Sequence, residues 1–378
     1  FGQGPVGLSA TQLAKAMGDR LKLLSTSRDR SAPARHQTLR AALAWSHGFL
    51  DAQEQAVFRR LAVFAGSTSL AMAQRVLADP PGAGALDEWA VLDALAVLVE
   101  RSLVGMVEVD GADPRYRLLD TPRLFALERL VDAGEHASLR SRHAQAVADS
   151  FEAAHERRFD GSIGERDWLR QVESDLDNAR EALAWAREAG DDLTLFRIAP
   201  AFVRALPRSA MAEHMAVAER IENRAADPVP LAVQVRALTA CRVAFSNLDP
   251  QRTRRISERA ADLALRLPGS PAHERLHYLA LCSLASAASI LSDDAVVGAA
   301  LARARALEDP TWPPQLLFFG ADAQARANRT NAGFLAAMRQ VMRLGEASGG
   351  DPAAWLPNLV DAELESLKDT KKVFFFVD

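Results

Sequence analysis

Residues 87–132 contain the clearest changes of hydrophobic period in the chain. Asp87 is a good N-cap residue, and apolar residues at helical spacing follow it: Val91, Leu92, Leu95, Leu98 and Val99. Residues 103–109 then have the apolar pattern of a short strand, and Gly111 interrupts it. Tyr116, Leu118 and Leu119 supply the partner strand. The pattern therefore predicts a helix followed by a two-stranded wing.

Helical periodicity returns directly after the predicted wing. Asp120 and Thr121 can cap this helix, with Pro122 at its first position. Its apolar face consists of Leu124, Phe125, Leu127, Leu130 and Val131. A helix, a two-stranded wing and a second helix are typical of the hairpin end of a winged helix.

The residues before this region predict the remaining helices of that domain. Helical patterns cover residues 9–24, 37–50, 55–64 and 69–77, with Ser9 capping the first and Asp51 the third. Polar residues and Pro33 make 25–35 a linker, and residues 79–85 a loop.

From about residue 135 onward, helical segments follow one another with short breaks rich in Gly, Pro, Asp and Asn. The predicted helices cover residues 135–156, 165–188, 193–206, 211–223, 231–246, 251–267, 273–291, 295–307, 315–328, 333–348 and 354–367. A helix pair recurs at roughly 35–40 residues, which is the range of tetratricopeptide-like repeats. The repeat is degenerate, and the segment is predicted to be an alpha-solenoid.

The chain is therefore predicted to be mainly α, with a winged-helix domain that includes a small β-hairpin, followed by an alpha-solenoid of tetratricopeptide-like helix pairs. Four regions follow from the pattern: a lid-like helix and linker at 1–35, the winged helix at 36–135, the helical repeats at 136–367 and an irregular tail at 368–378. Phe1 is not an initiator residue, so the sequence is expected to be a fragment of a longer protein.

Composition and charge support a helical protein without a global attraction to nucleic acid. Of the 378 residues, 49% are hydrophobic and only 6% are aromatic, and the formal net charge is -4. Cys241 and Cys282 lie in apolar helical stretches and are expected to be reduced core thiols. The sequence contains neither a signal peptide nor an apolar run as long as the roughly 20 residues of a membrane span, so a cytoplasmic location without membrane contact is expected.

One short motif suggests metal chemistry. His273, Glu274 and His277 spell HExxH, which on a helix presents two imidazoles on one face and a glutamate as general base for zinc-bound water. Arg275 places a charge inside the motif, and Pro271 places His273 in the first helical turn. A solvated helix face is therefore the preferred interpretation, and a zinc hydrolase is the weaker alternative.

The glycines near the N-terminus suggest a second motif, for nucleotide binding. Gly2, Gly4 and Gly7 have GxGxxG spacing, but no strand precedes them and Pro5 intervenes. No GxxxxGK[ST] sequence occurs, so no phosphate-cradling loop is expected in this chain. We accordingly expect no catalytic, cofactor-binding or metal site here.

The predicted winged helix raises the possibility of DNA binding. A recognition helix needs several outward Arg, Lys, Asn or Gln side chains, whereas residues 88–101 are mostly apolar or acidic apart from Arg101. A packing role is therefore favoured, and a DNA-binding winged-helix repressor remains the alternative. The arginines that could contact phosphate, or simply form a solvated face, are Arg59, Arg60, Arg115, Arg117 and Arg123.

Four segments resemble a known class of regulators: RHQTLRAALAWSHGFLDAQEQAVFRRLAVFAG (35–66), AVLDALAVLVERSLV (90–104), RYRLLDTPRLFALERLVDAGE (115–135) and DWLRQVESDLDNAREALAWARE (167–188). They are similar, in order, to the region that follows the ATPase core in bacterial signal-transducing ATPases related to the NB-ARC class. The resemblance covers about residues 10–190 and only the general helical character beyond.

This resemblance implies a regulatory fragment. An upstream nucleotide-binding domain, absent from this sequence, would bind ATP or ADP, and DNA would be bound only through a further N-terminal domain. The winged helix would pack over the nucleotide site, and the helical repeats would sense an effector or a protein partner. The winged helix would thereby hold a closed state, and the sensed signal would be relayed by a change from the closed to the open state. An effector can cause this change only if it has different affinities for the two states.

The resemblance also points to candidate docking residues after the wing. In the wider class, a histidine at the start of the following helix often contacts the nucleotide phosphate, and Leu119 stands at that position here. A direct phosphate contact is therefore not expected, and Asp120 is interpreted as the helix cap. Leu118, Leu119, Asp120 and Arg123 are predicted to contribute to docking on the nucleotide-binding domain.

Overall fold

The computed structural model describes residues 34–80, 82, 86–109, 112–224, 229–245 and 248–328, together with positions 340, 343, 344, 346 and 347. The chain divides into two compact units, Phe1–Ala146 and Val147–Asp378. The predictions for residues 9–24, 354–367 and 368–378, most of the predicted linker and most of the predicted helix at 333–348 lie outside the described residues.

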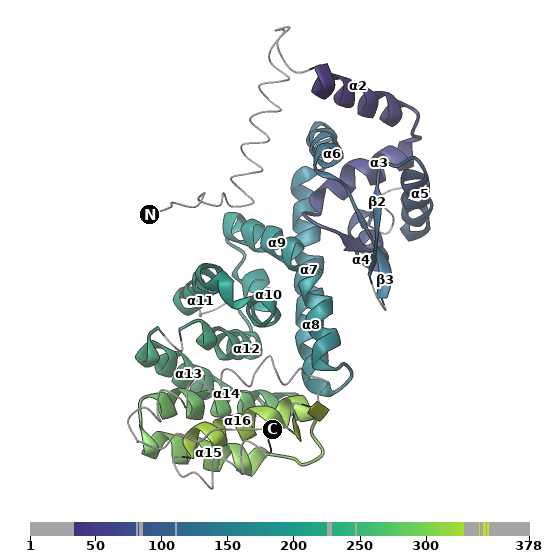
Figure 1. Ribbon diagram of the computed structural model, residues 1–378. Helices are drawn as coiled ribbons and strands as arrows, with labels where there is room; N and C mark the ends of the chain where they lie inside the picture. The colour runs from purple at the N-terminus through teal and green to yellow at the C-terminus, as the bar shows by residue number, and fades with distance from the viewer. Residues whose placement is uncertain are drawn as a thin grey trace, which may run out of the picture. The chain divides into compact units, whose positions relative to one another are not determined.

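The first unit contains five complete helices and a small sheet among its described residues (Figure 1). Its elements are α2 (Ala34–Gly48), α3 (Ala52–Arg60), the 3-10 turn η1 (Leu61–Val63), β1 (Thr68–Ser69), α4 (Leu70–Leu77), α5 (Glu88–Glu100), β2 (Gly105–Val109), β3 (Ala112–Arg117) and α6 (Asp120–Asp132). The helix α7 (His136–Asp160) begins in this unit, and the boundary between the units falls within it.

Local sequence signals explain where these helices begin. Asp51 accepts a hydrogen bond from the backbone N–H of Glu54 at 2.8 Å, and Glu54 accepts one from the backbone N–H of Asp51 at 2.9 Å. This reciprocal capping box starts α3. Ser69 caps α4 and Asp87 caps α5 by a single hydrogen bond each, which the side-chain oxygen accepts from the backbone N–H of Met72 and of Ala90. The predicted caps at Asp51 and Asp87 are confirmed.

The sheet has three antiparallel strands in the order β1-β3-β2. The hairpin β2–β3 pairs Met106 with Tyr116, so the predicted wing is confirmed. The two-residue strand β1 adds to the other edge of β3, with Thr68 opposite Tyr116. The sequence did not predict this third strand, because two residues carry no readable alternation.

Helices α3, α5 and α6 enclose the core of the first unit. α3 packs on both α5 and α6, and α4 packs on α5. Val57, Phe58 and Leu95 are completely buried between these helices. The apolar face read from residues 91–99 is thus the face that α5 buries, apart from its half-buried members.

The second unit is entirely helical in its described part. It contains the rest of α7, followed by α8 (Glu165–Glu173), α9 (Leu176–Ala189), α10 (Asp192–Ala205), η2 (Arg208–Ala210), α11 (Met211–Arg224), α12 (Leu231–Cys241), η3 (Arg242–Ala244), α13 (Pro250–Ala264), α14 (Pro271–Ile290), α15 (Asp294–Leu307) and α16 (Pro314–Ala327). Neighbours in sequence pack together, as with α9 on α10, α13 on α14, and α14 on α15 (Figure 1). Alanine is frequent among the buried residues of these helices, as with Ala179, Ala182 and Ala186 on α9.

The predicted fold class, mainly α with a winged helix, is confirmed, and three local predictions are corrected. Residues 165–188 form two helices, because the chain turns at Ser174 and Asp175 between α8 and α9. Leu118 and Leu119 lie beyond the end of β3. Asp120 is not the cap of α6: Leu119 occupies the N-cap position without a side-chain hydrogen bond, and Asp120 lies in the first turn. The boundary between the compact units lies between Ala146 and Val147, and the predicted domain boundary between 135 and 136 stays a prediction.

Candidate functional site

The order of elements in the first unit is that of a winged helix-turn-helix. α3 is followed by β1, the helix pair α4 and α5, and the hairpin β2–β3. In a helix-turn-helix, the second helix of the pair is the one that enters the major groove of DNA. The exposed face of α5 is therefore the first surface on which to look for function.

α5 buries one face and exposes an acidic one. Val91, Leu95 and Leu98 are completely buried in the core. Facing away from it are Glu88, Trp89, Asp93, Ala96 and Glu100, all of which are exposed. The indole of Trp89 is the largest apolar group on this surface, with 72% of the residue exposed. We call Glu88, Trp89, Asp93 and Glu100 the α5 face.

No basic side chain belongs to the α5 face. Arg101, the residue after the helix, directs its Nη1 to the carbonyl oxygen of Phe49 at 2.8 Å, and the same atom lies 3.9 Å from Glu54. The side chains of the face itself are therefore carboxylates and an exposed aromatic ring, with no cationic group among them. Such a surface repels phosphate and favours a basic protein partner.

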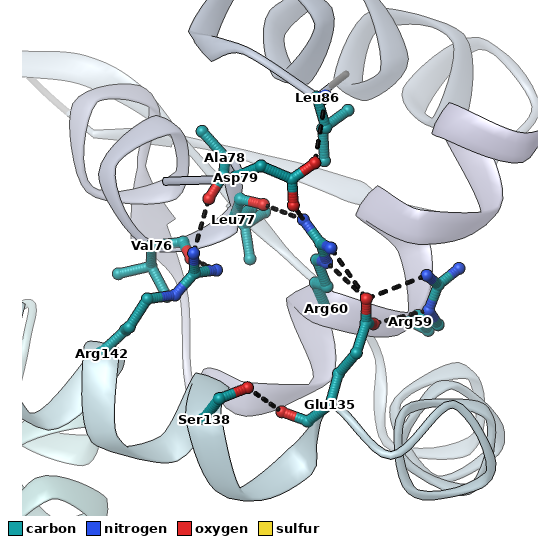
Figure 2. A network of polar contacts seen from close by, with 10 residues as sticks. All are labelled: Arg59, Arg60, Val76, Leu77, Ala78, Asp79, Leu86, Glu135, Ser138 and Arg142. Atoms are coloured by element: carbon teal, nitrogen blue, oxygen red, sulfur yellow. Dashed lines mark hydrogen bonds and ion pairs between the residues drawn. The ribbon is translucent and has the colours of Figure 1, made fainter. Parts of the chain in front are cut away.

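A cluster of arginines converges on Glu135, at the junction of α6 and α7 (Figure 2). Arg59 donates to the two carboxylate oxygens of Glu135 at 2.7 and 3.1 Å. Arg60 donates to one of them at 2.7 and 3.3 Å. Although burial alone would raise the pKa of Glu135, the hydrogen bonds and charges of the two arginines lower it to about 2.

The same cluster holds the end of α4. Arg60 also donates to the carbonyl oxygen of Leu77 at 2.7 Å and lies 2.8 Å from Asp79. Arg142, on α7, donates to the carbonyl oxygen of Ala78 at 2.7 Å and to that of Val76 (Figure 2). The carbonyls at a helix C-terminus have no partner within the helix, so the two guanidinium groups satisfy them. We call Arg59, Arg60, Asp79, Glu135 and Arg142 the Glu135 cluster.

The four arginines predicted as possible phosphate contacts lie in different environments: Arg59, Arg60, Arg115 and Arg117. Arg59 and Arg60 are held by Glu135, and Arg115 donates to the hydroxyl and carbonyl oxygens of Ser67 at 2.8 and 2.9 Å. Arg60 and Arg115 are buried, so the expectation of a solvated arginine face is wrong for these two residues. Arg117 alone of the four is exposed. The structure thus does not bring the four guanidinium groups together on one surface.

The predicted docking residues are also divided between core and surface. Leu118 is buried, whereas Leu119 and Asp120 are exposed at the start of α6. Arg123 donates to the carbonyl oxygen of Phe64 at 2.7 Å, which ties α6 to the end of η1. The apolar group that this segment offers to a partner is therefore the side chain of Leu119, which is 54% exposed.

The HExxH residues lie at the start of α14 and have other partners. The Nδ1 atom of His273 lies 2.7 Å from the carbonyl oxygen of Pro268, and the Nε2 atom of His277 lies 3.3 Å from Arg303. Burial, followed by the charge of Arg303, lowers the pKa of His277. In the part of the chain that the structure describes, no group of three or more His, Cys, Asp or Glu side chains could hold a metal ion. Glu274 is exposed.

Sequence reasoning did not single out Glu135, Asp79, Arg142 or Trp89. Glu135 lies 76 residues from Arg59, and no local pattern encodes such a pair. Trp89 could have been found, because it interrupts an otherwise acidic outer face at helical spacing from Asp93.

Among the described residues, no helix is both long and apolar enough to cross a membrane.

Comparisons with known proteins agree with this geometry. Residues 50–131 match the family model of the winged helix-turn-helix domain. A protein of Mycobacterium bovis named "Putative HTH-type transcriptional regulator" is 39% identical over 186 residues, covering 48% of this chain and 20% of the relative, and a protein of the same name from Mycobacterium tuberculosis matches equally. An uncharacterized protein of Mycobacterium tuberculosis is 36% identical over 140 residues, covering 36% of this chain and 33% of that protein.

The chain spans about a fifth of the length of the first of these curated relatives. No solved structure matches the chain significantly. The chain thus contains a winged helix-turn-helix domain and is similar to proteins named as regulators of transcription.

Proposed function

We propose that this chain is the regulatory region of a transcription regulator, and that its winged helix docks on a protein domain instead of reading DNA bases. The α5 face carries this proposal. It occupies the position from which a helix-turn-helix reads DNA, yet it presents Glu88, Asp93 and Glu100 with the exposed ring of Trp89. The names of the relatives support a role in the regulation of transcription, and the chemistry of the α5 face supports docking.

Electrostatics favours a protein partner over DNA. Affinity for DNA comes mostly from Lys and Arg side chains that neutralise phosphates, and base readout in the major groove uses mainly Arg, Lys, Asn and Gln. The α5 face supplies none of these. Exposed aromatic residues, by contrast, frequently anchor protein interfaces when a complementary pocket receives them. We therefore expect a partner with a basic rim around a pocket for Trp89.

The resemblance to signal-transducing ATPases suggests which partner this is. In that class a nucleotide-binding domain that holds ATP or ADP precedes the winged helix, and tetratricopeptide-like repeats follow it. We propose that the winged helix docks on such a domain, with Leu119 and Asp120 beside the interface. An effector bound by the helices of the second unit would shift the docking equilibrium through its different affinities for the docked and free states. The proposal assigns no reaction to this chain.

A binding measurement tests the docking. The purified nucleotide-binding segment, loaded with ADP, is titrated with this chain in a calorimeter. We expect binding that weakens at least tenfold in Trp89→Ala and in Asp93→Lys. Glu108→Lys is the matched control, because Glu108 is exposed on β2 outside the α5 face and its change of charge is the same. Equal weakening in all three variants, or no binding by the unaltered chain, would contradict the proposal.

DNA binding by a winged-helix repressor is the second candidate, favoured by the match to the winged helix-turn-helix model. Fluorescence anisotropy with a labelled duplex of mixed sequence, measured at low and at physiological salt, separates the two. A DNA reader would show affinity that falls steeply with salt. We expect no such binding, and a salt-dependent complex that Arg117→Gln weakens would overturn the docking interpretation in favour of DNA.

A further inference from the structure

A cavity of about 440 Å³ lies within the second unit, between three helices that are distant in sequence. The end of α7 supplies His155, Glu156, Phe159 and Asp160, and α12 supplies Ala232 and Arg236. The start of α14 supplies Ala272, His273, Arg275, Leu276 and Leu279. Cavities of this size hold small organic molecules in proteins.

The inner wall of the cavity is apolar. Phe159, Leu276 and Leu279 line it and are themselves buried. His155 packs edge-on against Phe159, with 5.0 Å between the ring centroids. Burial, followed by the charges of Arg236 and Arg158, lowers the pKa of His155 to about 3, so its imidazole is neutral near pH 7. The wall therefore offers an apolar surface and one uncharged polar ring.

The rim of the cavity carries charges of both signs. Arg236 is already engaged, since it donates to Glu156 at 3.0 Å and also pairs with Glu152. Arg275 makes no hydrogen bond and no ion pair with any residue that the structure describes. Asp160 accepts a hydrogen bond from the backbone N–H of Ser162 at 2.8 Å and is close enough to Arg275 to feel its charge. Glu156 is largely exposed, with 64% of its side chain accessible.

We propose that this cavity binds a small zwitterion with an apolar body, the class of the free apolar amino acids. The carboxylate of such a molecule would pair with Arg275. Its ammonium group would lie by Glu156 and Asp160, and its apolar side chain would lie on Phe159, Leu276 and Leu279. A simple anion is disfavoured because two carboxylates line the same rim, and a simple cation would leave Arg275 unpaired.

This inference names the class of effector for the sensing role proposed above. Its experiment uses this chain alone, so a failure of docking to the nucleotide-binding segment would leave it unaffected. The probes are L-phenylalanine, phenethylamine, which lacks the carboxylate, and 3-phenylpropionate, which lacks the ammonium group. Binding is measured by calorimetry on the full chain.

We expect L-phenylalanine to bind at least tenfold more tightly than either phenethylamine or 3-phenylpropionate. Arg275→Gln should weaken L-phenylalanine binding about tenfold, because a charge-assisted hydrogen bond contributes an affinity factor of roughly this size. It should not weaken binding of phenethylamine, which has no carboxylate to pair with Arg275. Ala272→Phe should block all three probes, since Ala272 is exposed at the cavity and a larger side chain there fills it without disturbing the core.

Two control variants make the same changes at positions of the second unit outside the cavity. Arg266→Gln removes an exposed arginine outside the cavity, and Ala302→Phe adds the same ring to an exposed position of α15. Both should bind L-phenylalanine as the unaltered chain does. Absence of L-phenylalanine binding at millimolar concentration, equal affinity for all three probes, or binding that survives Ala272→Phe would each overturn the proposal.

Discussion

The two units of this protein use arginine differently. In the first unit, several arginine side chains satisfy backbone carbonyl groups at the ends of elements, whereas Arg40 and Arg59 pair with the carboxylates of Glu128 and Glu135. Arg60 holds the carbonyl of Leu77, Arg142 those of Val76 and Ala78, and Arg123 that of Phe64. Arg115 and Arg101 do the same for Ser67 and Phe49.

In the second unit, arginines mostly join carboxylates on neighbouring helices. Arg180 on α9 donates to both oxygens of Glu213 on α11, at 2.8 and 3.0 Å. Arg252 on α13 meets Glu222 on α11 at 2.6 Å, and Arg197 on α10 meets Glu152 on α7 at 2.5 Å. Arg220 is an exception, because it donates to the carbonyl oxygen of Ala186.

The difference follows from the regularity of the backbone. The small sheet and the short helices α3 and α4, of nine and eight residues, leave carbonyl groups of the first unit without a backbone partner, and buried carbonyls must be paired. Most helices of the second unit satisfy their own carbonyl groups over a greater length, so the arginines of this unit pair mostly with carboxylate side chains. Contacts of arginine with backbone carbonyls thus occur mainly in the first unit, whereas arginine–carboxylate pairs between helices occur in both units and predominate in the second.

Removing Arg60 should have the largest effect on stability. Arg60→Met would leave the carbonyl of Leu77 and the carboxylate of Asp79 without this donor, in a site where the arginine side chain is only 10% exposed. Breaking one partner of a buried ion pair is strongly destabilising, and we expect a loss of about 3 kcal/mol in the first unit. Amide hydrogen exchange of α4, followed by mass spectrometry, measures it. Arg117→Met is the control, because Arg117 is exposed on β3 and its removal should give no measurable change in the exchange of α4. Equal exchange in the two variants would show that the carbonyl contacts are not needed.

The elements of the first unit could be read from the sequence because their signals are local. The caps at Asp51 and Asp87, the apolar face of residues 91–99 and the pairing near Met106 and Tyr116 each depend on neighbouring residues. The break at Ser174 and Asp175 could not be read, since the apolar period continues across it.

The Glu135 cluster and the cavity could not be predicted, because both depend on distant residues meeting in space. Arg59 and Glu135 were visible as charges, but nothing local joins residues 76 positions apart. The α5 face lies between these cases. Its lack of basic residues was read correctly from residues 88–101, and the helical spacing of Trp89 to Asp93 was readable as well, but the 72% exposure of Trp89 is known only from the structure.

Removing Arg236 tests the second half of the comparison and should have a smaller effect. Arg236→Met removes the donor to Glu152 and Glu156, but Glu152 keeps Arg197, and Glu156 is mostly in water. We therefore expect a loss of about 1.5 kcal/mol, from urea unfolding followed by exchange of α12. Arg266→Met, at an exposed position, should change nothing measurable. A loss as large as that in Arg60→Met would end the distinction between the two units.

The dependence of stability on pH should separate the units without altering their packing. His155 has a pKa of about 3 in the folded second unit and about 6.5 when unfolded, so the unfolded chain binds the extra proton between these values. Stability is therefore lost as pH falls from 6.5 toward 3. For Glu135 the folded pKa is about 2 and the unfolded value 4.5, so the first unit keeps this contribution above pH 4.5 and loses it between 4.5 and 2.

Two variants isolate these contributions, and each serves as the control for the other. His155→Phe should reduce the pH dependence of second-unit stability between pH 6.5 and 4.5 by about one proton. Glu135→Gln should leave that window unchanged and flatten the dependence of the first unit below pH 4.5. Urea midpoints at four pH values, resolved by exchange of α4 and α12, give both slopes. If Glu135→Gln altered the upper window, acid sensitivity would belong to a network shared by both units, and the local difference in arginine use could not explain it.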